Sequence, residues 1–274
     1  MTIPSPRRRA SPGTRWSVYR HGVQWGVLAV ALIGASRFIT VPGARSPEAY
    51  CPFGAIETAA SLAAGFGFLR QISLINGIVL GIVALSALVL GRVFCGWACP
   101  IGALSDGAAW LSRKLFGRQG PYPLQVPRAF DRPLRWLKVA VLGWVLWASL
   151  TAVVPPLAPF CPFRTLFELD LGSPLSWALI ATLFLLSMIV ERFWCRYLCP
   201  LGAILAPLNW LSPLRPRVNR EACVSCGRCR AACPAGIDPV ADGTEHPECV
   251  RCYACAEACS RIGALRFRHA AKDP

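Results

Sequence analysis

Four stretches of the chain are long, apolar and nearly free of charge. They are residues 21–36, which continue apolar to Val41 after an interruption at Arg37, and residues 71–91, 139–163 and 171–190. A helix needs about 20 such residues to cross the hydrocarbon core of a bilayer. Buried helices of soluble proteins are usually shorter and carry a polar face. The pattern therefore predicts a mainly α, integral membrane fold with four transmembrane helices within residues 21–210.

Basic side chains are concentrated in two of the segments that flank these stretches. Five arginines and no acid precede the first stretch, and residues 105–138 carry seven basic side chains against two acidic ones. Short loops rich in Lys and Arg remain in the cytoplasm. We therefore expect a basic cytoplasmic arm at residues 1–20, a basic cytoplasmic loop at 105–138 and both termini inside the cell.

The composition agrees with a membrane protein and argues against two other classes. Hydrophobic residues make up 54% of the 274 residues and charged residues 16%, against about 25% charged in soluble domains. A disordered chain would be far less hydrophobic. The net charge of +15 would also suit a nucleic-acid-binding protein, but much of it lies where the membrane topology requires it. We therefore expect membrane lipid as a partner and no nucleic acid.

The apolar part of the chain contains one cysteine pattern twice. A Cys-Pro-Phe element occurs at Cys51 and again at Cys161, and a Cys-x3-Cys-Pro-x-Gly-Ala element occurs at residues 95–103 and 195–203. Each repeat, 21–104 and 139–204, holds two predicted spans, so both copies have the same orientation about an axis along the membrane normal. This symmetry predicts that Cys51 lies near Cys161 at the outer side. It also predicts that four cysteines meet at the inner face, namely Cys95, Cys99, Cys195 and Cys199.

These four inner cysteines have several interpretations. Residues i and i+4 share one face of a helix, and the proline after the second cysteine would end that helix and free backbone N–H groups. Four converging thiolates suit an iron–sulfur cluster or zinc. Two disulfides or a dithiol redox pair are a second interpretation, and simple packing is a third. For Cys51 and Cys161, additional metal ligands, an extracytoplasmic disulfide and packing all remain open.

A proline-rich linker at residues 211–218 leads into two cysteine runs with the spacing Cys-x2-Cys-x2-Cys-x3-Cys. This is the pattern of bacterial ferredoxins with two clusters, in which the fourth cysteine of each run binds the other cluster. We predict that one [4Fe–4S] cluster is bound by Cys223, Cys226, Cys229 and Cys259. We predict that the other is bound by Cys249, Cys252, Cys255 and Cys233.

Other uses of these eight cysteines are disfavoured. Zinc sites prefer ligands in two separated pairs, and disulfides are rare in the cytoplasm. We therefore predict a cytoplasmic α+β domain of the two-cluster ferredoxin type over residues 219–265, followed by a tail at 266–274. A domain of this size has a small core, so we expect it to fold around its clusters.

Arg92 and Arg192 are equivalent in the two repeats, since each stands three residues before a cysteine. Ionisable groups near or within a membrane are costly and often mark a functional site. These two could stabilise thiolates or a reduced cluster, or bind a quinone oxygen. Snorkelling toward the lipid interface is the simpler explanation, and we expect it here.

With the doubled Cys-x3-Cys-Pro element, the Cys-Pro-Phe elements and the ferredoxin runs, the chain resembles the membrane polyferredoxin family from about Cys51 to Cys259. It is most similar to the quinol dehydrogenase membrane subunit of the periplasmic nitrate reductase type. The nitrous-oxide reductase regulator and the iron–sulfur accessory protein of haem–copper oxidase assembly are related to it. The resemblance implies a multi-pass protein of the bacterial inner membrane that relays electrons between the quinone pool, or a cytoplasmic donor, and a respiratory or periplasmic reductase.

Two further functions are alternatives to this relay. One is a membrane reductase for copper or thiols that assists maturation of a metalloenzyme, with Cys51 and Cys161 as its working end. The other is a redox-sensing regulator. The chain has no dinucleotide or flavin fingerprint, so we expect it to need a redox partner at each end. The resemblance leaves open whether the chain is itself an enzyme component, a quinol dehydrogenase.

Overall fold

The computed structural model describes residues 16–40, 52–54, 56, 74–117, 124, 126–151, 162, 165, 174–259 and 264–269. Within them, the long helices are α1 (Trp16–Thr40), α3 (Leu74–Leu90), α5 (Pro100–Leu115), α6 (Arg128–Thr151), α8 (Pro174–Ile189) and α9 (Pro200–Leu211). Shorter elements are α4 (Val93–Trp97), the π-helical turn η3 (Trp194–Leu198), α10 (Arg228–Ala231) and α11 (Ala254–Ala258). Two strands complete the description, β1 (Leu214–Val218) and β2 (Leu265–His269). The described chain is therefore mainly helical, as predicted.

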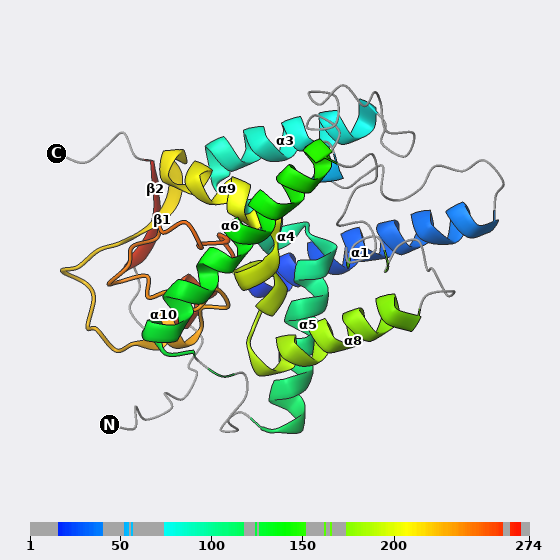
Figure 1. Cartoon of the computed structure of the whole chain (residues 1–274). Helices are drawn as coiled ribbons and strands as arrows, with labels where there is room; N and C mark the ends of the chain where they lie inside the picture. The colour runs from blue at the N-terminus through cyan, green and yellow to red at the C-terminus, as the bar shows by residue number, and fades with distance from the viewer. Residues whose placement is uncertain are drawn as a thin grey trace.

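Each predicted apolar stretch overlaps one long helix, namely α1, α3, α6 and α8. In Figure 1, α1, α3 and α8 extend toward one side of the molecule, and the strands with the cysteine-rich segment lie on the other. Large apolar side chains are exposed on all four helices, including Ile33, Ile82, Trp147 and Leu185. Soluble proteins rarely expose so much apolar surface. Among the described residues, α6 alone is both long and apolar enough to cross a bilayer.

The two repeats pack around each other with matching contacts. Helix α5 of the first repeat packs on α8 of the second, and α9 of the second packs on α3 of the first. Likewise α1 contacts α4 and α5, and α6 contacts the equivalent η3 and α9. These matching contacts agree with the tandem repeat seen in the sequence, and they bring the turns α4 and η3 to the centre of the fold.

The second cysteine of each Cys-x3-Cys pair lies outside the short turn that holds the first. The turns end at Trp97 and Leu198, and Cys99 and Cys199 have extended backbones with ψ of 120° and 112°. A residue before proline avoids the helical conformation, and proline itself favours the first position of a helix. Our expectation of one helical face carrying both cysteines was therefore wrong, because each proline begins a new helix.

The cysteine-rich part closes on a two-stranded sheet. Strands β1 and β2 pair antiparallel, with Leu214 opposite His269 and Val218 opposite Leu265. β1 lies in the segment interpreted as a linker and most of β2 lies in the segment interpreted as a tail. The sheet therefore joins the beginning and the end of the ferredoxin-like part.

Candidate iron–sulfur sites and the buried charges between them

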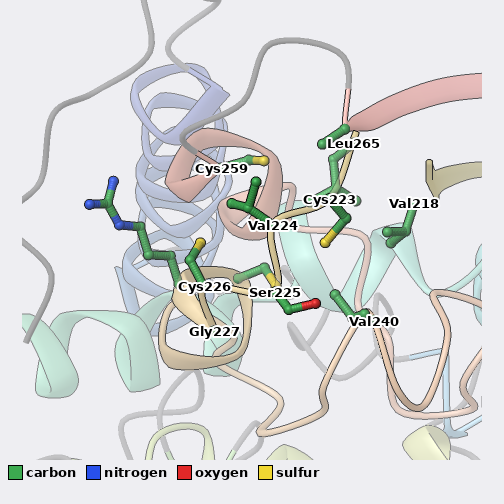
Figure 2. A pocket seen from close by; sticks show the side chains of 12 residues that line it. Val218, Cys223, Val224, Ser225, Cys226, Gly227, Val240, Cys259 and Leu265 are labelled. Carbon is green, nitrogen blue, oxygen red and sulfur yellow. The ribbon is translucent and has the colours of Figure 1, made fainter. Parts of the chain in front are cut away.

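Two cavities in the ferredoxin-like part are each lined by four cysteines. The outer cavity is lined by Cys223, Cys226, Cys229 and Cys259. The inner cavity is lined by Cys233, Cys249, Cys252 and Cys255. Figure 2 shows the outer cavity, where the labelled cysteines reach it from separate segments of the chain. Each cavity thus combines three cysteines of one run with the last cysteine of the other, which is the grouping that we predicted from the spacing.

The loops around the two cavities have matching conformations. Ser225 and Arg251 occupy equivalent positions and have φ of 50° and 52°. Gly227 and Tyr253 are also equivalent and have φ of 69° and 58°. Left-handed residues are costly for side chains other than glycine, and they are frequent where a loop holds a ligand. The repeated conformation lets three closely spaced cysteines face one cavity.

The donor groups fit iron–sulfur clusters. All twelve cysteines in the described part of the chain are free, so no disulfide competes for their thiols there. Over the same residues, no three His, Cys, Asp or Glu side chains are close enough to bind a single metal ion. The four thiolates around a cubane each bind a different iron, and they therefore stand farther apart than the ligands of one zinc ion.

The four cysteines of the membrane repeats also lie together. Cys195 is buried and interacts electrostatically with Cys99, Cys199 and Cys95. The expected meeting of the two repeats at these cysteines is therefore present. Cys51 and Cys161 lie outside the described residues, so their predicted proximity stays a prediction.

Backbone groups at two helix starts are directed at these thiols. The N–H group of Gly102 donates to the sulfur of Cys99, and that of Gly202 donates to the sulfur of Cys199. A β-carbon on Gly102 would lie 2.9 Å from the carbonyl oxygen of Cys95, so glycine allows this close packing. Burial, together with the neighbouring Cys95, raises the pKa of Cys99 to about 12 and that of Cys199 to about 11. These thiolates therefore need a bound metal or nearby cations.

Arg92 and Arg192 are both buried, at 1% exposure. Arg192 donates to the carbonyl oxygen of Cys95 in the other repeat at 3.1 Å. The guanidinium of Arg92 lies beside Gly202, also in the other repeat, where an added β-carbon would stand 2.8 Å from it. The expected snorkelling to lipid was wrong, because Arg192 instead reaches the cysteine turn of the opposite repeat and Arg92 reaches the start of the helix that follows the other turn.

Arg92 also connects the membrane repeats to the ferredoxin-like part. It donates to the carboxylate of Glu248 at 3.1 Å and to the carbonyl oxygen of Pro247 at 2.9 Å. Lys138 of α6 pairs with the other oxygen of the same carboxylate. These two cations hold the pKa of Glu248 at about 2, although burial alone would raise it. Glu248 directly precedes Cys249, so this ion cluster holds one end of the inner cavity.

Asn209 of α9 strengthens the same junction. Its side-chain N–H groups donate to the carbonyl oxygens of His246 and Cys249 at 2.8 and 2.9 Å. Its side-chain oxygen accepts from the backbone N–H of Arg92 at 3.2 Å and from the guanidinium of Arg251 at 3.3 Å. One buried amide is therefore bonded to both halves of the molecule.

Arg192 has a different acidic partner. It donates two hydrogen bonds of 2.7 Å to the carboxylate of Asp106 on α5. Gln24 of α1 also donates to this carboxylate, at 2.9 Å, and to the carbonyl oxygen of Gly96. Arg192 holds the pKa of Asp106 down to about 2 against the effect of burial. The first long helix is thus bonded directly to the turn that contains Cys95.

A third buried carboxylate contacts the cysteine turn of the second repeat. Asp131 of α6 accepts hydrogen bonds from Arg196 and Tyr197, each at 2.7 Å, and pairs with Arg135. Arg135 in turn donates to the carbonyl oxygen of Ala235, two residues after Cys233. The second repeat therefore reaches the other edge of the inner cavity.

Gly96 and Val250 make a close contact between the two halves. A β-carbon on Gly96 would collide with the carbonyl oxygen of Val250. Cys95, Val250 and Cys252 belong to one buried apolar cluster, which also includes Phe53 of the first Cys-Pro-Phe element. The inner cavity and the membrane cysteines therefore share a continuous core.

The sequence patterns do not indicate the carboxylates Glu248, Asp106 and Asp131 or the amide of Asn209. They also do not predict the contact of α1 with the ferredoxin-like part, where the backbone N–H of Ser17 donates to Glu257 at 2.8 Å. A usable signal was present only at Asp106, an isolated acid among the small and apolar residues of 100–112.

Two cysteine cavities of the ferredoxin type, packed on a duplicated helical part, define an iron–sulfur electron-transfer protein. A family model described as a 4Fe–4S binding domain matches residues 74–119 and 173–219, and each match includes the Cys-x3-Cys pair of one repeat. A second model with that description matches residues 216–237. The chain belongs to the membrane polyferredoxin family, whose members are ferredoxin-type electron-transport proteins.

Three relatives illustrate the match. YccM of Escherichia coli, named for electron transport, is 34% identical over 191 residues, which cover 66% of this chain and 52% of YccM. The uncharacterized protein MJ0750 of Methanocaldococcus jannaschii is 32% identical, over 70% of this chain and 78% of its own length. The ferredoxin-type protein NapH of Haemophilus influenzae is 30% identical, over 65% and 63%. The chain thus spans about half the length of YccM. No solved structure matches.

Proposed function

We propose that this protein is a membrane electron relay with the order outer cluster, inner cluster and membrane cysteines. The observation that carries the proposal is the shared core of Cys95, Val250 and Cys252. It packs the inner cavity directly against the cysteine turn of the first repeat. Electrons would pass between the quinone pool, or a cytoplasmic donor, and a respiratory or periplasmic reductase.

Two [4Fe–4S] clusters would occupy the two cavities. Cys223, Cys226, Cys229 and Cys259 would hold the outer cluster, and Cys249, Cys252, Cys255 and Cys233 the inner one. When bound, the clusters supply one-electron chemistry. The chain positions them, and the buried loop of the inner cavity excludes water from its cluster.

The helical part would cross the bacterial inner membrane four times, with both termini and the segment 105–138 in the cytoplasm. The exposed apolar faces of α1, α3, α6 and α8 support this arrangement. The uneven distribution of basic side chains supports its orientation. Lipid would cover these faces, and the ferredoxin-like part, at 219–265 with β1 before it, would lie on the cytoplasmic side.

The four cysteines of the two Cys-x3-Cys pairs would form an additional redox centre. Cys95, Cys99, Cys195 and Cys199 come together at two helix starts, where backbone N–H groups favour negative charge. Arg92 supports this assignment. Its Nε is buried and has no hydrogen-bond partner within the described residues, and its guanidinium interacts with the sulfurs of Cys95 and Cys199. An anionic centre would supply the missing partner.

Iron and acid-labile sulfide analysis, with low-temperature EPR, tests the proposal on anaerobically purified protein. About eight irons per chain would fit the two tail clusters, and more than eight would show that the membrane cysteines also carry iron. We expect the double variant Cys99→Ser and Cys199→Ser to return the count to about eight while both tail signals persist. Zinc in place of iron would overturn the relay.

A second measurement tests Cys51 and Cys161 of the Cys-Pro-Phe elements, which the relay does not use. Cys51→Ser and Cys161→Ser should leave the rate of quinol oxidation unchanged in protein reconstituted with its acceptor. A loss of quinol oxidation in either variant would place these cysteines in the electron path. A selective loss of copper or thiol reduction would favour a maturation role instead.

A further inference from the structure

Val224 and Val250 hold the same place in the two cysteine runs, directly after the first cysteine of each. Val250 is 4% exposed, because the first membrane repeat covers it, whereas Val224 is 53% exposed. The second cysteine of each run shows the same difference, since Cys252 is buried and Cys226 is exposed. One loop of the ferredoxin-like part is therefore covered by the membrane repeats, and its counterpart is open.

The contacts of the covered loop show what kind of protein surface packs against a loop of this conformation. The backbone at Val250 lies against the backbone at Gly96, and the indole N–H of Trp97 donates to the carbonyl oxygen of Arg251 at 3.0 Å. The ion pair of Arg92 with Glu248 lies beside this contact, because Glu248 is two residues before Val250. Because the open loop has the same left-handed positions, it offers a surface of the same form.

The surroundings of the open loop are basic. Residues 220–230 carry three arginines against one glutamate, a net charge of +2. Arg220 and Arg230 are exposed. Neither forms an ion pair with any residue that the structure describes.

The adjoining sheet adds four more arginines. β1 and β2 contribute Val218 and Leu265 to the outer cavity, and their register places Arg215 opposite Arg268 and Arg217 opposite Arg266. Arg215 pairs with Glu245 at 4.0 Å, so part of the positive charge on β1 is neutralised.

We propose that the open loop, residues 223–229, with Arg220 and Arg230 at its edge, is the docking surface for a soluble, acidic one-electron carrier protein. The inference rests on the proposed relay, because the loop lies over the outer cavity. The carrier gives up one electron and is oxidised, the outer cluster accepts it and is reduced, and no covalent bond changes. A small apolar centre inside a charged edge suits a weak, fast complex.

Stopped-flow reduction of the full-length protein in nanodiscs of zwitterionic lipid tests this surface. The probe is a dithionite-reduced acidic [2Fe–2S] ferredoxin, and binding is followed separately by interferometry with the oxidised ferredoxin. Attraction between opposite charges should make the second-order rate fall about tenfold when the ionic strength rises from about 20 mM to about 200 mM. We expect Arg220→Glu with Arg230→Glu to lower both the rate and the affinity at least about tenfold at low salt.

Two controls separate docking from other effects. Lys114→Glu makes the same charge change as Arg230→Glu at an exposed site on α5 and should leave the ferredoxin rate within about twofold, whereas Arg230→Glu alone should lower it about threefold. Reduced methyl viologen, a small cation that needs no docking surface, should reduce the clusters of every variant at the wild-type rate.

Each alternative result decides between docking and its rivals. A wild-type ferredoxin rate in the double variant, with viologen-reducible clusters, would overturn the docking surface and leave the relay standing. If phosphatidylglycerol in the nanodisc abolished ferredoxin binding to the wild-type protein but did not change the remaining binding to the double variant, the arginines would be lipid contacts, and docking would be overturned. Absence of any [4Fe–4S] signal after viologen would overturn the relay and this inference with it.

Discussion

Arg92 and Arg192 hold the same place in two copies of one sequence element, yet Arg92 binds Glu248 in the ferredoxin-like part and Arg192 binds Asp106 in the membrane part. The duplicated turn therefore has two uses. One arginine attaches the cysteine-rich domain, and the other joins the repeats to each other.

Replacing Asp106 by Asn should destabilise the helical part. The change leaves Arg192 buried without a charged partner, and breaking a buried pair typically costs about 3–5 kcal/mol. Thermal unfolding in detergent, followed by circular dichroism, measures the effect. Glu191→Gln is the matched control, because its pair with Arg113 is partly exposed and should be worth less than about 1 kcal/mol. Equal losses in the two variants would contradict the role assigned to Asp106.

Replacing Glu248 by Gln should loosen the ferredoxin-like part from the repeats. Arg92 and Lys138 would lose their shared carboxylate, and their remaining like charges would repel each other. We expect faster loss of iron to a chelator from the inner cluster than from the outer cluster, resolved by EPR. Glu221→Gln removes an exposed carboxylate of the same part and should change neither rate. An equal rate of iron loss from the inner cluster in Glu248→Gln and in wild type would show that this ion pair does not hold the junction.

Replacing Gly96 by Ala should separate the two halves by steric collision. The added methyl group would meet the carbonyl oxygen of Val250, and forced overpacking typically costs about 1–3 kcal/mol. Gly143→Ala on α6 has nothing within 4 Å of the new atom and should be neutral or slightly stabilising, because alanine favours helix. Rapid-freeze EPR should show slower oxidation of the inner cluster in Gly96→Ala only. An unchanged rate with an intact fold would exclude this contact from the electron path.

Removing iron should unfold the ferredoxin-like part before the helical part. The domain has a small core and its cysteines face two cavities, so cluster binding should supply much of its folding free energy. After anaerobic chelation, limited proteolysis should cut within residues 219–265 while fragments containing α1 to α9 persist. If residues 219–265 resisted proteolysis after complete loss of iron, the core of this domain would be sufficient to fold it without clusters.

The cysteine spacing allowed the sequence to predict the grouping of the tail thiols, because ligands at fixed short separations leave few arrangements. The internal repeat likewise predicted that Cys95, Cys99, Cys195 and Cys199 would meet. Both inferences use local spacing or symmetry, which a single sequence displays directly.

The junction between the two halves could not be predicted in this way. Arg92 and Glu248 are 156 residues apart, and Arg192 and Asp106 are 86 apart, so nothing in their local patterns connects them. The burial of Arg92 and Arg192 was missed for the same reason, since a charged residue near the end of an apolar stretch has the same sequence whether lipid or protein surrounds it.

Gly96 and Val250 meet through their backbones, with no side chain of Gly96 between them. Such a contact has no rotamers, so side-chain motion cannot open or close it. In the proposed relay, the rate of electron tunnelling between the ferredoxin-like part and the membrane cysteines would therefore be fixed when the protein folds. Any gating of electron flow would have to arise where partners arrive and leave.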